Sequence, residues 1–227
     1  MNRLPFDLYD FFGYLASGFL VLLGMQLLFG FPQVLGQDFR PVDTTALLLA
    51  IYVAGHIVAG PAKTLLEDGL VAKVLRRPSV NLFHAQKPRL RSILFPGFYQ
   101  QLPPSVQRKV LTKAKRADIN APGEQLFLHA RYHPNTLANE KLMAKLHSFL
   151  SQYGFARNMA FTSLLLGFAL LLKSRIPVGA AEPDVVSYAW TAMVVGILLL
   201  YRYLKFFRQY SYELFNVFAE MPEDDRP

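Results

Sequence analysis

The chain alternates between long apolar stretches and one polar segment. Residues 11–31 contain no charged side chain, and residues 44–62 contain a single ionisable one, His56. Two further apolar stretches cover residues 158–172 and 185–201. A 21-residue helix spans about 31 Å, which matches the roughly 30 Å hydrocarbon core of a bilayer. We therefore predict four transmembrane helices, of which 158–172 is short for a full crossing.

The polar segment, residues 63–157, is too long for a connector and too polar to enter a bilayer. Helices are predicted over 63–77, ending before Pro78, over 105–117 with Ser105 as N-cap, and over 124–132. A longer helix capped by Asn135 or Thr136 is expected to run towards the third apolar stretch. The fold class is therefore an all-α membrane protein with a mostly helical basic cytoplasmic domain between transmembrane helices 2 and 3.

This pattern predicts four regions along the chain. Residues 1–62 comprise a lead-in and two transmembrane helices, 63–157 the basic domain, 158–203 two more transmembrane helices, and 204–227 a cytoplasmic helix with an acidic tail. In the last region, mostly apolar residues three or four apart fall on one face of a helix. We expect this face to pack against a partner helix. These residues are Leu204, Phe207, Ser211, Leu214 and Phe218.

The positive charge is local. Residues 63–157 hold sixteen of the 24 Lys and Arg residues and five of the 16 Asp and Glu, a net charge of +11, whereas the whole chain is +8. Lys and Arg concentrate on the cytoplasmic side of membrane proteins. We therefore expect the basic domain and both termini in the cytoplasm of a multi-pass protein.

Composition argues against several classes of enzyme. The chain has no Cys, which excludes disulfides, thiolate nucleophiles and Cys-ligated zinc. His129 and His133 are four residues apart, but no further ligands are spaced to complete a metal site. No Walker, Rossmann or GxSxG motif occurs. We expect a protein that is not an enzyme and has no metal or cofactor.

Cations interleaved with aromatic and His side chains suit phosphate binding and base stacking. Anionic lipid headgroups are the alternative ligand, since cations near a membrane surface also bind them, and a plain solvated surface is the third interpretation. The candidate nucleic-acid-binding residues are Lys87, Arg89, Arg91, Arg108, Lys109, Lys113, Lys115, Arg116, Arg131, Tyr132 and His133.

Within the apolar stretches, His56 is a candidate pore or proton-sensing residue, because ionisable groups inside membranes tend to be functional. The alternative is a neutral His that is hydrogen-bonded to a neighbouring helix. Small residues four apart allow close helix packing and favour a homo-oligomer. These pairs are Gly13 and Ser17, Ala50 and Ala54, Ser163 and Gly167, and Ala192 and Gly196.

Four sequence features carry a resemblance to a known family. They are FDLYDFFGYLASGFLVLL, AIYVAGHIVAG, QYGFARNMAFTSLLL and a final span with an aromatic, basic tail. This layout resembles the membrane effectors of the Hailong anti-phage defence system, or related small multi-pass defence effectors. The resemblance covers the whole layout and rests on hydrophobic signatures.

The resemblance implies an oligomeric ion channel in the bacterial inner membrane with a cytoplasmic crown. In that family the crown binds single-stranded DNA oligomers made by a partner nucleotidyltransferase. Bound DNA holds the channel shut, and its loss opens the channel and depolarises the cell. Asn158, Thr162 and Ser163 would then be pore-lining candidates, although ordinary helix packing explains them equally well. The alternative function is a non-enzymatic membrane scaffold whose basic domain binds anionic lipid.

Overall fold

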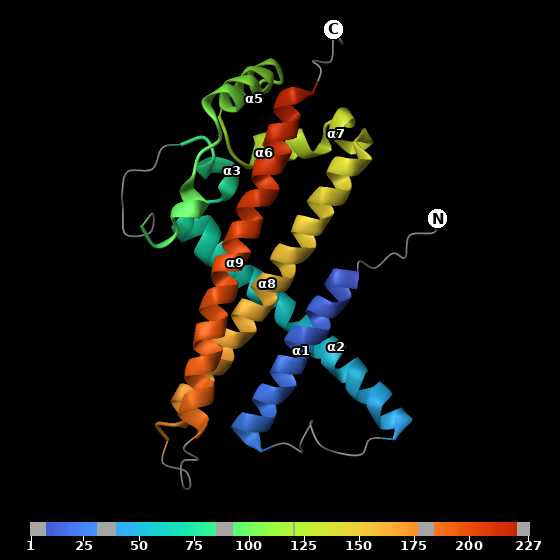
Figure 1. Cartoon of the computed structure of the whole chain (residues 1–227), viewed down its shortest axis with the longest axis vertical. Coiled ribbons are helices and arrows are strands. Elements are labelled where there is room, and N and C mark those ends of the chain that lie inside the picture. Colours follow the sequence, from blue (N-terminus) through green and yellow to red (C-terminus); the bar gives the residue numbers. More distant parts are fainter. Residues whose placement is uncertain (1–7, 31–39, 85–92, 120, 177–183, 222–227) are drawn as a thin grey trace. The chain divides into compact units, whose positions relative to one another are not determined.

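The computed structural model describes residues 8–30, 40–84, 93–119, 121–176 and 184–221 (Figure 1). Within these ranges the regular structure is helical, and no strand occurs. The elements in chain order are α1 (Leu8–Phe29), α2 (Pro41–Ala62), the π-helix η1 (Lys63–Leu75), α3 (Pro78–Asn81), the 3₁₀ helix η2 (Pro96–Tyr99), α5 (Pro104–Arg116), α6 (Glu124–Tyr132), α7 (Pro134–Ala138), α8 (Glu140–Lys173) and α9 (Asp184–Glu220).

Among the described residues, four helices are long and apolar enough to cross a membrane, which confirms the prediction of four candidate spans. They lie in 11–29, 41–81, 140–173 and 184–220. The third apolar stretch is not an isolated short helix, because α8 begins at Glu140 and continues to Lys173. At about 1.5 Å per residue, its 34 residues are long enough to span a bilayer.

The chain divides into two compact units. Unit 1 comprises residues 1–69 and 151–203, and unit 2 comprises residues 70–150 and 204–227. Unit 2 thus combines most of the basic segment with the helical region that follows the fourth apolar stretch. The helices η1, α8 and α9 contribute residues to both units.

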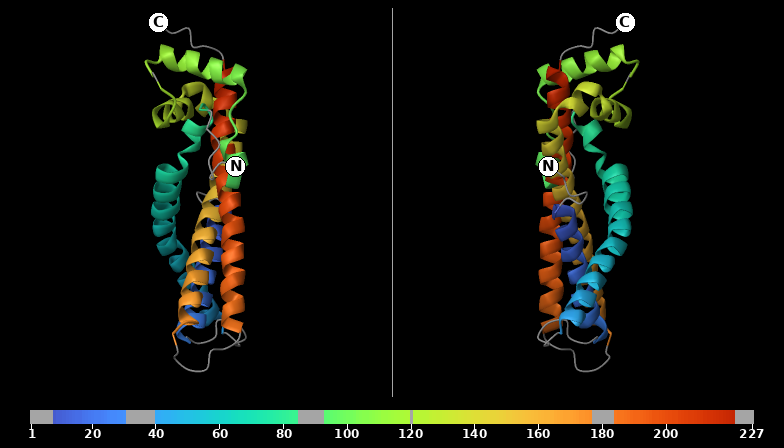
Figure 2. Two further views of the ribbon diagram at one scale, coloured as in Figure 1. Left: turned by 90° about the vertical axis from the view of Figure 1, so that its left-hand side faces the viewer. Right: turned by 90° about the vertical axis from the view of Figure 1, so that its right-hand side faces the viewer.

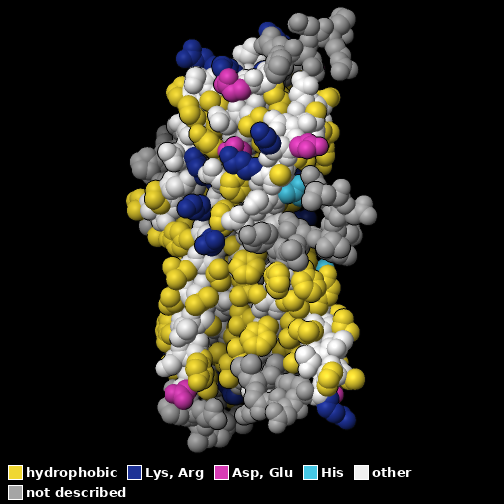
Figure 3. Space-filling model, turned by 45° about the vertical axis from the view of Figure 1, so that its right-hand side comes forward, with side chains coloured by type: hydrophobic (Ala, Val, Ile, Leu, Met, Phe, Trp, Pro, Cys, Tyr) yellow, Lys and Arg dark blue, Asp and Glu magenta, His cyan; other side chains and the backbone are white. Residues whose placement is uncertain are grey.

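In unit 1, α1 and α2 cross at two glycines (Figure 1). A Cβ atom on Gly18 would overlap the backbone oxygen of Ile51, and one on Gly55 would overlap the backbone oxygen of Tyr14. The two backbones therefore touch directly at this crossing, as small residues allow in membrane helices. On the face drawn in Figure 3, hydrophobic side chains gather in a band over the lower part of the view, where few charged side chains appear.

Also in unit 1, α8 and α9 run side by side (Figure 2). Gly167 of α8 faces Met193 and Ala189 of α9, and Gly196 of α9 faces Leu164 of α8. Two of the small residues expected to favour self-association therefore serve close packing within one chain. Lys173 ends α8 and donates a hydrogen bond of 2.6 Å to the backbone oxygen of Leu27 in α1.

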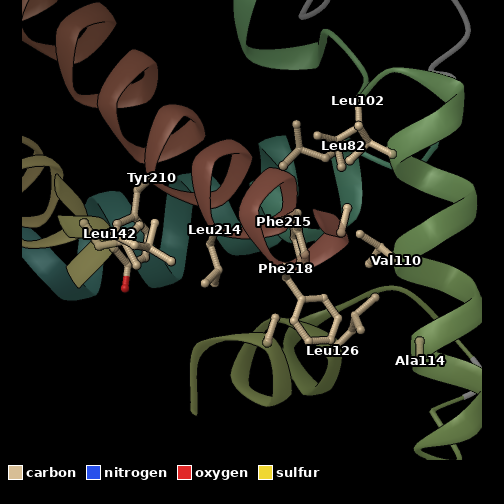
Figure 4. Close-up of a cluster of buried hydrophobic side chains, with 14 of the residues drawn as sticks. Leu82, Leu102, Val110, Ala114, Leu126, Leu142, Tyr210, Leu214, Phe215 and Phe218 are labelled. Atoms are coloured by element: carbon tan, nitrogen blue, oxygen red, sulfur yellow. The ribbon is translucent and has the colours of Figure 1, made fainter. Parts of the chain in front are cut away.

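Unit 2 is built around a hydrophobic core, part of which is drawn in Figure 4. Leu214, Phe215 and Phe218 of α9 are almost completely buried in it, against Val110 of α5 and Leu126 of α6. Burying a large apolar side chain contributes about 1.5–3 kcal/mol. The prediction that this face of the last region packs against helices is confirmed for Leu214 and Phe218.

Two predicted helix caps are wrong. Pro103 occupies the N-cap of α5 without a side-chain hydrogen bond, and Pro104 is the first helical residue, so Ser105 lies inside the helix. Proline suits a first helical position because its missing N–H would have no partner there. Asn139, and neither Asn135 nor Thr136, caps α8: its side-chain oxygen accepts a 3.0 Å hydrogen bond from the backbone N–H of Leu142.

Candidate polyanion-binding surface

Helix α5 presents the largest group of predicted binding residues in the described part of the chain. Val106, Val110 and Ala114 face the core of unit 2 at a spacing of four residues, which fixes the orientation of the helix. Arg108 and Lys115, seven residues apart, are exposed and have no side-chain partner among the described residues. Lys109 and Arg116 are also exposed, and Lys113 is half-buried.

Two of these lysines bind the end of α9. Lys113 Nζ donates hydrogen bonds to the backbone oxygens of Phe218 and Ala219, at 2.8 and 3.3 Å, and also reaches that of Met221. The last carbonyls of a helix lack helical partners and carry a partial negative charge, so a cation there is favourable. Lys109 Nζ lies 2.8 Å from a carboxylate oxygen of Glu220. Part of the charge predicted for ligand binding therefore stabilises unit 2.

A hollow of about 400 Å³ lies between α5 and the end of α9. Arg108, Lys109 and Thr112 line it from one side, and Glu220 and Met221 from the other. The Lys109–Glu220 pair is exposed, and exposed pairs contribute about 0–1 kcal/mol, so an incoming anion can displace the carboxylate at little cost.

Helix α6 contributes an aromatic and cationic group. Arg131 Cζ lies 5.5 Å from the ring centroid of Tyr132 and 5.9 Å from that of Tyr210. The Tyr132 side chain is 60% exposed, so its ring is open to stacking, whereas Tyr210 is buried in the core. A cation beside an exposed ring is the combination that single-stranded nucleic-acid sites use.

The α5 and α6 candidates meet at one aromatic ring. Lys113 Nζ lies 5.4 Å from the ring centroid of Phe218, and the rings of His129 and His133 lie 5.8 and 5.6 Å from it. Burial, and secondly the neighbouring His133, lower the pKa of His129 below its ordinary value of 6.5. The His133 ring lies against Phe218 of the unit 2 core, and its Nδ1 is buried. It is therefore less open to a ligand than the ring of Tyr132.

The two histidines lie with ring centroids 5.9 Å apart. Within the described ranges, no group of three or more His, Cys, Asp or Glu side chains could hold a metal ion. Lys87, Arg89 and Arg91 lie outside the described residues. Their part in any binding surface stays a prediction.

The four pore candidates fall into two places in unit 1. Asn158, Thr162 and Ser163 of α8 are buried, and Thr162 Oγ1 donates a 2.9 Å hydrogen bond to the backbone oxygen of Asn158. Ser163 Oγ is buried with no hydrogen-bond partner among the described residues. In a single chain these residues thus pack between helices, and a pore along them requires helices to separate.

His56 belongs to a different cluster, on α1 and α2. Its ring is stacked on Tyr14, with centroids 3.8 Å apart and an interplanar angle of 18°. Tyr52 approaches the same ring edge-on at 4.6 Å. His56 remains exposed on the surface of the single chain. Whether it acts as a pore residue or as a neutral, hydrogen-bonded His stays a prediction.

One polar pair in unit 1 was not predicted. Arg157 Nη1 of α8 lies 2.7 Å from a carboxylate oxygen of Glu67 in η1, and both side chains are largely buried. Arg157 Nε and Nη2 also donate to the side-chain oxygen of Asn158, each at 3.2 Å. The signal in the sequence was the acidic pair Glu67 and Asp68, which begins five residues after the second apolar stretch.

No protein-family model, curated protein or solved structure matches the chain. Its function is therefore inferred from its own residues and their geometry, together with the layout described above. The most informative surface for that purpose is the exposed side of α5 with the neighbouring Arg131 and Tyr132.

Proposed function

We propose that the chain is the subunit of an oligomeric ion channel of bacterial anti-phage defence, held closed by a single-stranded DNA oligomer on its basic unit. Loss of the ligand opens the channel and depolarises the cell. The proposal places the protein in the inner membrane with unit 2 and both termini in the cytoplasm. The ligand comes from a partner nucleotidyltransferase.

The observation that carries the proposal is the exposed cationic side of α5. Arg108 and Lys115 lie two helical turns apart with no internal partner in the described ranges, so both are available to phosphates. Tyr132 adds an exposed ring beside Arg131 for base stacking. Phosphate-binding cations and a stacking ring together favour a single strand over a lipid headgroup, which offers no base.

Signal transfer in this proposal uses helices that contribute to both units. α8 and α9 are continuous over 34 and 37 residues, so a displacement of either within unit 2 is carried along a stiff element. Allosteric coupling of this kind requires two arrangements with different affinity for the ligand. Asn158, Thr162 and Ser163, which are buried in the single chain, would become pore-lining in the open arrangement.

The test is fluorescence anisotropy of labelled single-stranded DNA with the detergent-purified chain. We expect tight binding that Arg108→Glu/Lys115→Glu weakens by at least about tenfold. The matched control is Lys141→Glu/Lys205→Glu, which reverses two exposed lysines of unit 2 on α8 and α9. Lys113 is unsuitable for this test because it binds the last carbonyls of α9, so replacing it would also weaken unit 2.

Vesicles with and without anionic lipid separate the two ligands. Two results together would favour the lipid-binding scaffold. The chain would bind DNA no more tightly than anionic vesicles, and Arg108→Glu/Lys115→Glu would leave DNA binding unchanged. Channel recordings complete the test. Nuclease treatment of the DNA-bound protein in a planar bilayer is expected to increase the conductance, and an unchanged conductance would contradict the gating mechanism.

A further inference from the structure

The segment that continues α2 has an unusual hydrogen-bond pattern. η1 is a π-helix of 13 residues, whereas π-helical geometry usually occurs as a single turn within an α-helix. Eight of the 13 residues in the segment, KTLLEDGLVAKVL, are Leu, Lys, Glu or Ala, which are good α-helix formers, and Gly69 is its one strongly unfavourable residue. Local preference therefore does not explain the wider helix, and interactions from outside the segment must hold it.

Pro61 accounts for the place where the pattern changes. It lies inside α2, two residues before η1 begins. Proline has no N–H to donate, and its ring collides with the carbonyl four residues earlier, which disturbs the α-helical ladder at that turn. This disturbance is local, so it does not account for π-helical geometry as far as Leu75.

An ion pair anchors the first half of η1, within unit 1. Glu67 accepts a hydrogen bond of 2.7 Å from Arg157, and the two side chains are only 16% and 13% exposed. Removing one member of a buried pair leaves the other charge uncompensated, which typically costs about 3–5 kcal/mol. Asn158 fixes the guanidinium from its other side, so Arg157 cannot easily follow if Glu67 turns away.

Two side chains fix the other end of η1, within unit 2. The backbone oxygen of Leu75 accepts hydrogen bonds from Asn81 Nδ2 and Tyr99 Oη, both at 3.1 Å. Asn81 also donates to the backbone oxygen of Arg76 at 2.9 Å. Arg76 has a φ of 64°, a left-handed conformation that costs a non-glycine residue about 1–2 kcal/mol. The end of the helix is thus determined by its surroundings.

The direction of Glu67 depends on the type of helix. Successive residues of an α-helix turn by about 100°, and the wider turn of an i→i+5 helix gives a smaller angle. From Lys63 onwards the difference accumulates, so an α-helical segment would carry the Glu67 carboxylate away from Arg157. The ion pair therefore requires the π-helical geometry of η1.

We propose that the Glu67–Arg157 pair is a latch that holds η1 as a π-helix, and that η1 relaxes to an α-helix when the pair breaks. The relaxation lengthens the segment and rotates the chain that follows it about the helix axis. η1 is then a conformational switch between α2 and α3 in the sequence. This inference does not depend on the ligand proposed above.

The test measures the length of η1 directly. The chain has no Cys, so the double variant Leu65→Cys/Val74→Cys carries spin labels at these two positions and nowhere else. Both positions are exposed. The nine-residue separation corresponds to roughly 13.5 Å along an α-helix and to less in a π-helix. In the detergent-purified full chain we expect Glu67→Gln and Arg157→Gln each to shift the label distance upwards, towards the α-helical value.

Two further variants keep the result interpretable. Lys63→Gln removes an exposed charge from the same segment without touching the pair and is expected to leave the distance unchanged. Glu67→Arg/Arg157→Glu retains both charges and is expected to restore the shorter distance. An unchanged distance in both single variants, an equal shift in Lys63→Gln, or no restoration in the exchanged pair would each overturn the latch. Retained helicity and a single size-exclusion peak establish that each variant is folded.

Discussion

Lys113 of α5 donates a 2.8 Å hydrogen bond to the backbone oxygen of Phe218, close to the last residue of α9. The same side chain lies over the Phe218 ring, 5.4 Å from its centroid. A residue that the sequence places in a ligand-binding row thus caps a helix whose Phe218 is buried in the core of unit 2. The role of a cation in this unit therefore depends on whether it faces α9 or solvent.

Replacing Lys113 should weaken unit 2. Lys113→Ala removes hydrogen bonds from a charged donor to helix-terminal carbonyls, and we expect a loss of about 1–2 kcal/mol in the free energy of unfolding. Thermal unfolding of the detergent-purified chain, followed by circular dichroism, measures this loss. Lys115→Ala, two residues further along α5 and exposed, is the control and should leave the transition unchanged. Equal transitions for the two variants would show that the capping is unimportant.

The glycine crossing of α1 and α2 should not tolerate a methyl group. A Cβ on Gly55 would overlap the backbone oxygen of Tyr14, and backbone cannot move aside as a flexible side chain can. We expect Gly55→Ala to lower stability by about 1–3 kcal/mol, the usual cost of overpacking. Gly60 lies in the same helix with nothing within 4 Å of an added Cβ. Gly60→Ala should show no loss in the same thermal assay, because the added methyl group meets nothing and alanine favours a helix more than glycine does. A similar loss in both variants would contradict the role of the close crossing.

Unit 2 should lose stability as the pH falls below about 6.5. Burial and the nearby His133 depress the pKa of His129 in the folded state, so the unfolded chain binds its proton more readily. Stability then rises with pH between the depressed pKa and the unfolded value of 6.5 and is constant above it.

The pH prediction is tested by measuring unfolding transitions of wild type and His129→Gln across that range. The variant is expected to show a shallower decline on acidification. His147→Gln, which replaces an exposed His of α8, should retain the full decline. Identical profiles for all three proteins would assign the acid sensitivity to other groups.

The sequence was sufficient for features that depend on local pattern. Uncharged stretches located four membrane-length helices, and the helix predicted over 105–117 agrees closely with α5, Pro104–Arg116. The boundaries of α6 were also predictable, since the helix ends at Tyr132, two positions before Pro134. In each case the information lies within one or two helical turns of the residues concerned.

Features that depend on distant partners were not predictable. Glu67 and Arg157 are 90 positions apart, so neither reveals the other in the sequence. The π-helical geometry of η1 was also missed. Most of its residues favour an α-helix, and the contacts at its two ends come from residues outside the segment. The two helix caps were wrongly predicted because a neighbouring residue takes the position instead. Pro104 begins α5 one residue before Ser105, and Asn139 lies closer to the start of α8 than Asn135 or Thr136.

The backbone contact between α1 and α2 has a thermodynamic consequence. Where two helices meet through Gly18 and Gly55, no side-chain rotamer has to be fixed at the point of closest approach. Ordering a long side chain costs up to about 1.5–2 kcal/mol, and glycine avoids that cost. Association of these two helices is therefore entropically inexpensive. The stacked rings of Tyr14 and His56 lie beside this crossing and join the same two helices.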